Sequence, residues 1–179
     1  MGFGPSAVVD ISLNTQLSPE QRDKFQNTRT IREILGSAKT IAIVGFSTEK
    51  TKASNMVGTY LQDEGYRVIP VNPRAAGSEI NGEKVYASLL EIPDKVDVVD
   101  VFRPSAEVSK IVDDAITIGA KAVWTQLRIV ELDAAARAQA AGLLVVVDKC
   151  IKMEHGRFGG ALHFAGMNTE VITARRPKR

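Results

Sequence analysis

The chain has 179 residues, the length of one ordinary domain, and its 44% hydrophobic and 25% charged residues are typical of a globular protein that folds in water. Its formal net charge of +2 is too small to indicate a nucleic-acid or membrane partner. The single cysteine excludes an intramolecular disulfide, and no apolar stretch is long enough for a membrane span, so we expect a cytoplasmic protein.

Two short helices are predicted before the first strand. Ser18 has the features of a helix cap, because proline follows at the first helical position and Gln21 lies three residues after the cap. A similar pattern begins at Thr30, with Glu33 three residues further along, and Gly36 is expected to end that helix.

Five apolar, β-branched runs then alternate with stretches whose apolar residues have helical spacing. Pro70 falls in the second run and favours a place at the end or the edge of a sheet, because proline has no N–H to donate. The alternation predicts an α/β fold with a Rossmann-like, doubly wound parallel sheet of about five strands and flanking helices. The expected strands are residues 40–44, 67–71, 96–102, 122–124 and 143–148.

The pattern also divides the chain into three segments. We expect residues 1–28 to form an N-terminal arm with a short helix, and residues 29–155 to form the Rossmann-like domain. Residues 156–179 are expected to be a C-terminal extension that ends in a solvated basic tail.

The first strand is followed by a loop that suits a phosphate group. In sheets of this kind ligands bind beyond the carboxyl ends of the strands, where the strand order reverses. Gly45 and Phe46 open the loop, Ser47 and Thr48 offer hydroxyl groups, and Lys52 adds charge just before a helix. The loop matches neither the three-glycine dinucleotide motif nor the P-loop, and an ordinary strand-to-helix loop with solvated lysines gives the same pattern.

The end of the second strand discriminates better between ligands. An NAD-binding chain would place an acidic residue there to accept hydrogen bonds from the ribose, but this chain has Asn72, Pro73 and Arg74. A guanidinium beside the ribose suits a sugar that carries a phosphate, as in NADP and coenzyme A. A surface arginine in a turn is the alternative.

The third and fourth strand ends supply further candidate pocket residues. Phe102 offers a flat apolar face, Arg103 a second guanidinium and Pro104 a rigid turn. Trp124 and Gln126 follow the fourth strand in the same way. Phe102 and Trp124 are also the kind of residue that a core contains, so both interpretations remain open for them.

Catalytic and metal-binding chemistry is not indicated. A nucleophilic Cys150 would need a base, and His155 lies only five residues on, but a lone cysteine after a buried strand is more often inert. Together with His163 these residues lack the regular spacing of a zinc site. We therefore name no catalytic residue and no metal ligand.

Several of these motifs occur in one order that is characteristic of a known family. They are Ile41-Ala42-Ile43-Val44-Gly45, Lys52-x-Ser54, Val68-Ile69-Pro70-Val71-Asn72-Pro73, Val101-Phe102-Arg103, Trp124-x-Gln126 and Asp148-x-Cys150-Ile151-Lys152. The chain resembles the stand-alone CoA-binding proteins that are related to the N-terminal domain of the succinyl-CoA synthetase α subunit.

The resemblance implies coenzyme A as the bound molecule. It implies that the first loop, Gly45 to Thr48 with Lys52, holds the pyrophosphate, and that the turn from Asn72 to Arg74 lies by the adenosine. It also implies that the third and fourth strand ends line the rest of the groove, through Phe102, Arg103, Pro104, Trp124 and Gln126. Many relatives have arginine where this chain has Lys52, which would turn a two-point phosphate contact into a single-point one.

The leading hypothesis is the binding of coenzyme A or an acyl-CoA without catalysis. Synthetase activity is not expected, because the resemblance implies that a synthetase also needs a second domain with a phosphorylated histidine, and His155 and His163 do not substitute for it. One alternative is an NAD(P)-dependent oxidoreductase or redox sensor, and another is a regulatory subunit that uses coenzyme A as a signal. A homo-oligomer formed through an exposed helix face is left open.

Overall fold

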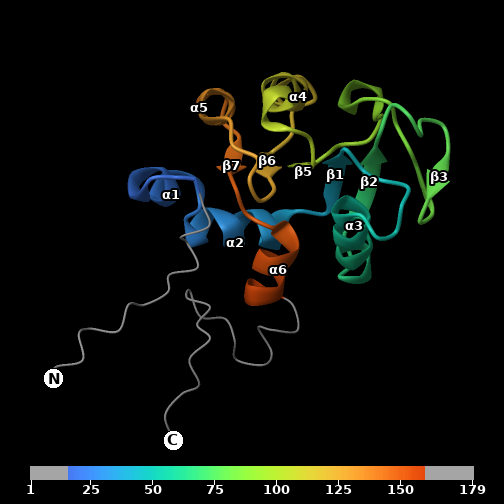
Figure 1. Ribbon diagram of the computed structural model, residues 1–179, viewed down its shortest axis with the longest axis horizontal. Helices are drawn as coiled ribbons and strands as arrows, with labels where there is room; N and C mark the ends of the chain where they lie inside the picture. Colours follow the sequence, from blue (N-terminus) through green and yellow to red (C-terminus); the bar gives the residue numbers. More distant parts are fainter. Residues whose placement is uncertain (1–15, 160–179) are drawn as a thin grey trace, which may run out of the picture.

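The computed structural model describes residues 16–159 and shows a parallel sheet with helices on both faces (Figure 1). The Rossmann-like α/β fold predicted from the sequence is thereby confirmed. The helices are α1 (Pro19–Phe25), α2 (Thr28–Ser37), α3 (Ala53–Asp63), α4 (Ser105–Thr117), α5 (Leu132–Ala140) and α6 (Ile151–Phe158), with a short 3₁₀ helix, η2 (Leu89–Glu91). No helix within the described range is both long and apolar enough to cross a membrane.

The five strands of the main sheet pair in parallel in the order β2-β1-β5-β6-β7. They are β1 (Thr40–Val44), β2 (Arg67–Val71), β5 (Val98–Val101), β6 (Ala122–Thr125) and β7 (Leu144–Val146). A small antiparallel hairpin of β3 (Glu79–Ile80) and β4 (Glu83–Lys84) forms a second sheet, which contacts β2 through the ion pair of Arg67 and Glu83. Each strand of the main sheet overlaps a predicted one. Pro70 lies in β2, which is an edge strand, as its missing N–H predicts.

Two apolar layers cover the sheet. Helices α1, α4 and α5, with η2, pack on one face, and helices α2, α3 and α6 pack on the other (Figure 1). The chain therefore leaves β1 through α3 on one face and leaves β5 through α4 on the opposite face. The switch in direction between these neighbouring strands opens a crevice at their carboxyl ends, which is where ligands of such sheets bind.

The helix caps show one prediction confirmed and one wrong. Ser18 forms a capping box with Gln21, because its Oγ accepts the N–H of Gln21 at 3.3 Å and the Gln21 Oε1 accepts the N–H of Ser18 at 2.9 Å. Thr30 does not cap α2. Asn27 does, since its Oδ1 accepts the N–H of Thr30 at 2.8 Å and the helix begins one residue after it.

Both edges of the main sheet are partly covered by other parts of the chain. Beside β2, the N–H of Tyr86 donates to the carbonyl of Pro70 at 3.1 Å, and the carbonyl of Tyr86 accepts from the N–H of Asn72 at 2.9 Å. Beyond β7, the N–H of Val147 donates to the carbonyl of Phe25 at 3.1 Å. Gln26 Nε2 completes this second cover by donating to the carbonyl of Val147 at 2.9 Å.

The last part of the predicted N-terminal arm packs on the sheet. Leu17 and Phe25 are buried in the layer that α4 and α5 form. Residues 1–15 and 160–179, which include the predicted basic tail and His163, lie outside the described residues. The boundaries at 28 and 155 stay a prediction.

Candidate functional site

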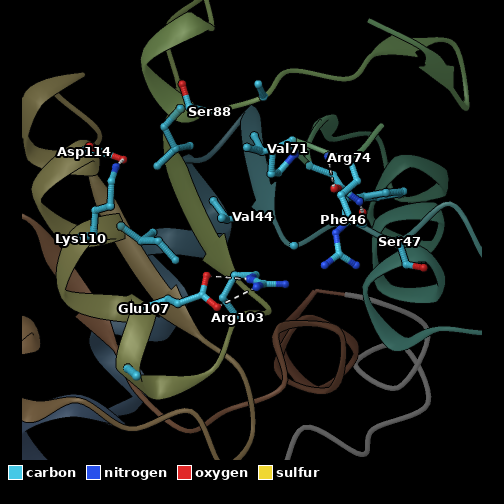
Figure 2. A pocket seen from close by; sticks show the side chains of 17 residues that line it. Val44, Phe46, Ser47, Val71, Arg74, Ser88, Arg103, Glu107, Lys110 and Asp114 are labelled. Carbon is cyan, nitrogen blue, oxygen red and sulfur yellow. Dashed lines mark hydrogen bonds and ion pairs between the residues drawn. The ribbon is translucent and has the colours of Figure 1, made fainter. Parts of the chain in front are cut away.

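A groove of about 580 Å³ opens at the switch crevice, beyond the carboxyl ends of β1 and β2 (Figure 2). One wall consists of the loop after β1 and the turn after β2, and the other consists of Arg103 and the first three turns of α4. Apolar side chains from β1, β2, η2 and α4 lie between these walls. The predicted site residues that line the groove are Gly45, Phe46, Ser47, Asn72, Pro73, Arg74 and Arg103.

Gly45 is required by the packing of the neighbouring strand. Its φ of +89° lies in the left-handed region, and a Cβ there would lie 2.8 Å from Cδ of Arg103 and 2.9 Å from the carbonyl oxygen of Phe102. The close approach at this glycine is therefore made by the end of β5. A bound phosphate is not needed to explain the glycine.

The first three backbone donors of the loop are already used within the protein. The N–H groups of Gly45 and Phe46 both donate to the carbonyl of Val71, at 3.0 and 3.2 Å. The N–H of Ser47 donates to Oγ of Ser54 at 3.0 Å. These three N–H groups are therefore not available to an anion in the groove, and an anion beside this part of the loop would depend on side chains.

Phe46 anchors this loop from below. Its side chain is 2% exposed and packs in the layer beneath α3, so that only the remainder of the residue reaches the groove. Gly58 of α3 makes room for the ring, because a Cβ there would lie 2.5 Å from Cε2 of Phe46. The aromatic ring holds the loop in place and is not available to stack on a ligand.

Asn72 joins the two loops of the same wall. Its Nδ2 donates to the carbonyl of Phe46 at 2.8 Å, and its Oδ1 accepts the N–H of Arg74 at 2.9 Å. The amide is used on both sides, which fixes the turn after β2 against the loop after β1. Asn72 thus positions Arg74.

The charged side chains of the groove differ in their partners. Arg103 forms a two-point ion pair with Glu107, from Nε to Oε2 at 2.9 Å and from Nη2 to Oε1 at 2.7 Å (Figure 2). Lys110 pairs with Asp114 at 2.8 Å. Arg74 is exposed on the opposite wall, and its guanidinium forms no ion pair within residues 16–159.

Other predicted site residues do not line the groove: Thr48, Lys52, Phe102, Pro104, Trp124 and Gln126. Trp124 and Phe102 pack in the layer on the α3 and α6 side of the sheet, whereas the groove extends along α4. Trp124 is fully buried, and its Nε1 donates to the carbonyl of Lys149 at 2.7 Å. The core interpretation therefore describes its side chain. Lys52 approaches Glu49 to 3.9 Å at the surface.

Gln126 contacts a buried acid in β5. Asp100 is fully buried in β5, and its Oδ1 accepts from Nε2 of Gln126 at 2.8 Å. Its Oδ2 has no hydrogen-bond partner among the described residues. Burial in this apolar setting raises the pKa of Asp100 from 3.8 to about 7.

Cys150 and His155 do not form a reactive pair. Burial raises the pKa of the Cys150 thiol, which makes it a weaker nucleophile. The Nδ1 of His155 shares a hydrogen bond of 3.0 Å with the hydroxyl of Tyr60, and burial lowers the pKa of the imidazole. Within the described part of the chain no group of three or more His, Cys, Asp or Glu residues could hold a metal ion.

Fold and groove together define an α/β protein of the Rossmann-like class, with a partly basic groove at the switch between β1 and β5. The chain belongs to the CoA binding domain family, whose model matches residues 39–156. The resemblance seen in the sequence is thus confirmed, and the matched range contains both walls of the groove.

Individual relatives agree with this assignment. The chain is 38% identical over 125 residues to "Uncharacterized protein YneT" of Bacillus subtilis, which covers 70% of this chain and 91% of that protein. It is 35% identical over 95 residues to the α subunit of acetate–CoA ligase [ADP-forming] I of Pyrococcus furiosus, but this match covers 51% of the chain and only 21% of that subunit. A solved structure, a hypothetical protein from Pyrococcus horikoshii, has 42% identity and a TM-score of 0.70, covering 74% of this chain and 92% of that one.

Proposed function

We propose that the groove binds coenzyme A or an acyl-CoA, and that the chain does not itself catalyse a reaction. The observation that carries this proposal is the position of Arg74 and Arg103 on opposite walls of a groove at the switch crevice, in a chain of the CoA binding domain family. The volume of about 580 Å³ falls in the range of small-molecule sites.

The composition of the groove suits the adenosine part of such a ligand. Val44, Val71, Leu89 and Ile111 supply an apolar floor on which a flat base would be buried. The 3′-phosphate would pair with Arg74, whose guanidinium is exposed and carries no acidic partner within the described residues. The pyrophosphate would lie towards Ser47 and Arg103.

The hydrogen bonds that the loop after β1 already makes within the protein affect how the phosphates would be held. Since the N–H groups of Gly45, Phe46 and Ser47 bond within the protein, phosphates beside the loop after β1 would be recognised mainly by arginine side chains and the hydroxyl of Ser47. Side-chain charges on an open groove are screened by salt more than buried donors are. Binding is therefore expected to weaken clearly as the ionic strength rises.

The relation to the acetate–CoA ligase subunit supports binding more than ligation. The chain matches about a fifth of that subunit, so most of the ligase has no counterpart in the match. Within residues 16–159 the only cysteine has a raised pKa, and the histidine there is bonded to a tyrosine. We therefore propose that the shared part is a CoA-binding module.

Isothermal titration of the full chain with coenzyme A, dephospho-CoA, NADP and NAD tests the proposal. We expect coenzyme A to bind most tightly, with a loss of affinity when the 3′-phosphate is absent. Affinity for coenzyme A no better than for NAD would overturn the proposal. Tighter binding of NADP than of coenzyme A would instead favour the oxidoreductase alternative, which shares the arginine at the end of β2.

A further inference from the structure

The ion pair of Arg103 and Glu107 stands at the mouth of the groove. Two hydrogen bonds, of 2.9 and 2.7 Å, join the guanidinium to the carboxylate, and both side chains are 46% exposed. Figure 2 shows the pair bridging the end of β5 and the first turn of α4, on the side of the groove opposite Arg74. Each partner shifts the other towards its charged form, because the pKa of Arg103 is raised and that of Glu107 is lowered by their hydrogen bond.

Arg103 has little freedom to leave this partner and turn elsewhere. Its Cδ fills the space where Gly45 would carry a Cβ, at 2.8 Å from that position, so the stem of the side chain is held against the loop after β1. Glu107 holds the other end by a planar, two-point contact. The guanidinium is thus fixed beside the loop, with its charge already balanced by an acid.

The other basic side chain on the α4 wall of the groove is also neutralised by an acid. Lys110 pairs with Asp114 one turn further along, also at the groove. Among the ionisable groups that line the groove, Arg74 alone lacks an acidic partner within the described residues. A ligand with several phosphate charges would therefore meet two carboxylates on one wall and a single uncompensated cation on the other.

We propose that Glu107 is an intramolecular competitor for Arg103, which limits the affinity of the groove for phosphorylated ligands. This inference rests on the proposed function and adds to it a residue that sets the strength of binding. Glu107 takes up two of the five N–H donors of Arg103, on the edge that joins Nε and Nη2, so a phosphate can bind that edge only if Glu107 yields its hydrogen bonds. On the remaining edge, between Nη1 and Nη2, a phosphate meets a guanidinium whose charge the acid already balances. The acid also repels the phosphate directly.

The alternative role for Glu107 is to position Arg103 for the ligand. The two roles predict opposite changes in ligand affinity when Glu107 is neutralised. If Glu107 competes, its neutralisation tightens binding, whereas if it only positions the guanidinium, its neutralisation weakens binding. Competition is favoured because the Arg103 stem is held by Gly45 without any help from the acid. Since the pair is exposed, the expected gain is about two- to fivefold in affinity, as for other exposed ion pairs.

Titration of coenzyme A into the wild-type chain and into the Glu107→Gln variant shows whether neutralising Glu107 raises or lowers the affinity. The matched control is Asp113→Asn, which removes the same charge from the same helix but breaks a surface pair with Arg137 at 3.0 Å outside the groove. We expect Glu107→Gln to bind coenzyme A about two- to fivefold more tightly, and Asp113→Asn to bind it like the wild type. A gain of the same size in Asp113→Asn would mean a general charge effect and would overturn the inference.

The Arg103→Ala background identifies the target of the competition. In that background Glu107→Gln should change the affinity by less than about half of its effect in the wild type, because the group for which it competes is gone. An unchanged effect, or weaker binding by Glu107→Gln in the wild type, overturns the role assigned to Glu107 while the CoA site itself stands. If neither the wild type nor any variant binds coenzyme A, the proposed function fails as well.

Discussion

The side chain of Arg103 occupies the space that a side chain at position 45 would need. The Cδ of Arg103 lies 2.8 Å from the position of a Cβ on Gly45, and the carbonyl of Phe102 lies 2.9 Å from it. The glycine therefore connects the end of β1 to the end of β5, and it places a guanidinium at the crevice between two strands whose helices lie on opposite faces. The architecture of the groove depends on this contact.

Gly45→Ala should destabilise the protein and weaken ligand binding together. The left-handed φ of +89° alone costs a non-glycine residue about 1–3 kcal/mol, and the methyl group must also displace the Arg103 stem and the backbone of Phe102. Urea unfolding measures the loss of stability, and titration with coenzyme A measures the loss of affinity. Gly36→Ala is the control, because nothing lies within 4 Å of its Cβ position in helix α2, and we expect it to stabilise the fold by about 0.5–1 kcal/mol. Wild-type stability in Gly45→Ala would contradict this account of the glycine.

Arg74→Ala should remove most of the preference for a 3′-phosphate. The exposed guanidinium has no acidic partner among the described residues, so its charge is available to the ligand, and we expect a loss of about 1.5 kcal/mol towards coenzyme A. The affinity for dephospho-CoA should change much less. Arg29→Ala, which removes an exposed arginine from helix α2 on the other face of the sheet, should leave both affinities unchanged. Equal losses for both ligands would show that Arg74 contacts a different part of the molecule.

Asn72 offers a test of the wall that carries Arg74. Asn72→Ala removes a donor to Phe46 and an acceptor from Arg74, and it should lower the free energy of unfolding by about 1–2 kcal/mol. Asn72→Asp retains the acceptor but cannot donate at neutral pH, so it should also be destabilised. Both variants should bind coenzyme A more weakly than Gln62→Ala, whose amide makes only a 3.4 Å surface contact. Thermal unfolding measures the stability of each variant, and titration measures its affinity for coenzyme A. Wild-type stability or wild-type affinity in Asn72→Ala would contradict the role assigned to Asn72.

Asp100 should make the stability of the protein depend on pH. Its pKa is raised by burial from 3.8 to about 7, so the folded protein holds this proton more tightly than the unfolded chain does. The free energy of unfolding should therefore fall as the pH rises from 4 to 7. Asp100→Asn keeps an acceptor for Gln126 without a charge, and relative to the wild type it should gain about 2–4 kcal/mol between pH 4 and pH 8. Parallel pH profiles of the two proteins would contradict the raised pKa.

Asp97, which lies just before β5, has a pKa shifted in the opposite direction from that of Asp100. Burial opposes its ionisation, but hydrogen bonds from Lys121 and from the backbone N–H groups of Lys39 and Thr40 together lower its pKa. The stability that this carboxylate contributes is present at neutral pH and is lost as the pH falls through its lowered pKa. Asp97→Asn should thus be destabilised at pH 7, with a deficit that shrinks in acid.

The strands were predictable because their signal is local. The runs at β1 and β2 have the bounds expected from the sequence, since parallel strands covered on both faces consist of almost continuous apolar residues. Pro70 even indicated an edge position. The order of the strands was not predictable, because it depends on which side of the sheet each helix crosses and no residue pattern within a strand records that choice.

The site was only partly predictable, because residue type does not show where a side chain points. Trp124 and Gln126 follow a strand end as a pocket residue would, yet one is fully buried in the core and the other bonds to Asp100. Glu107 was missed although it lies four residues after Arg103, a spacing at which an acid and a base on a helix regularly meet. That spacing was the available signal.

The covered edges of the main sheet have a consequence for how copies of the chain can meet. Tyr86 bonds to Pro70 and Asn72 on the outer side of β2, and Phe25 with Gln26 bonds to Val147 just beyond β7, so each edge presents a shortened ladder of backbone groups to another molecule. Unprotected edges are the usual starting points for strand-to-strand aggregation and domain swapping, and this chain covers part of both edges with its own segments. Strand addition by a second copy is accordingly disfavoured, and a homo-oligomer is expected to form through helix surfaces.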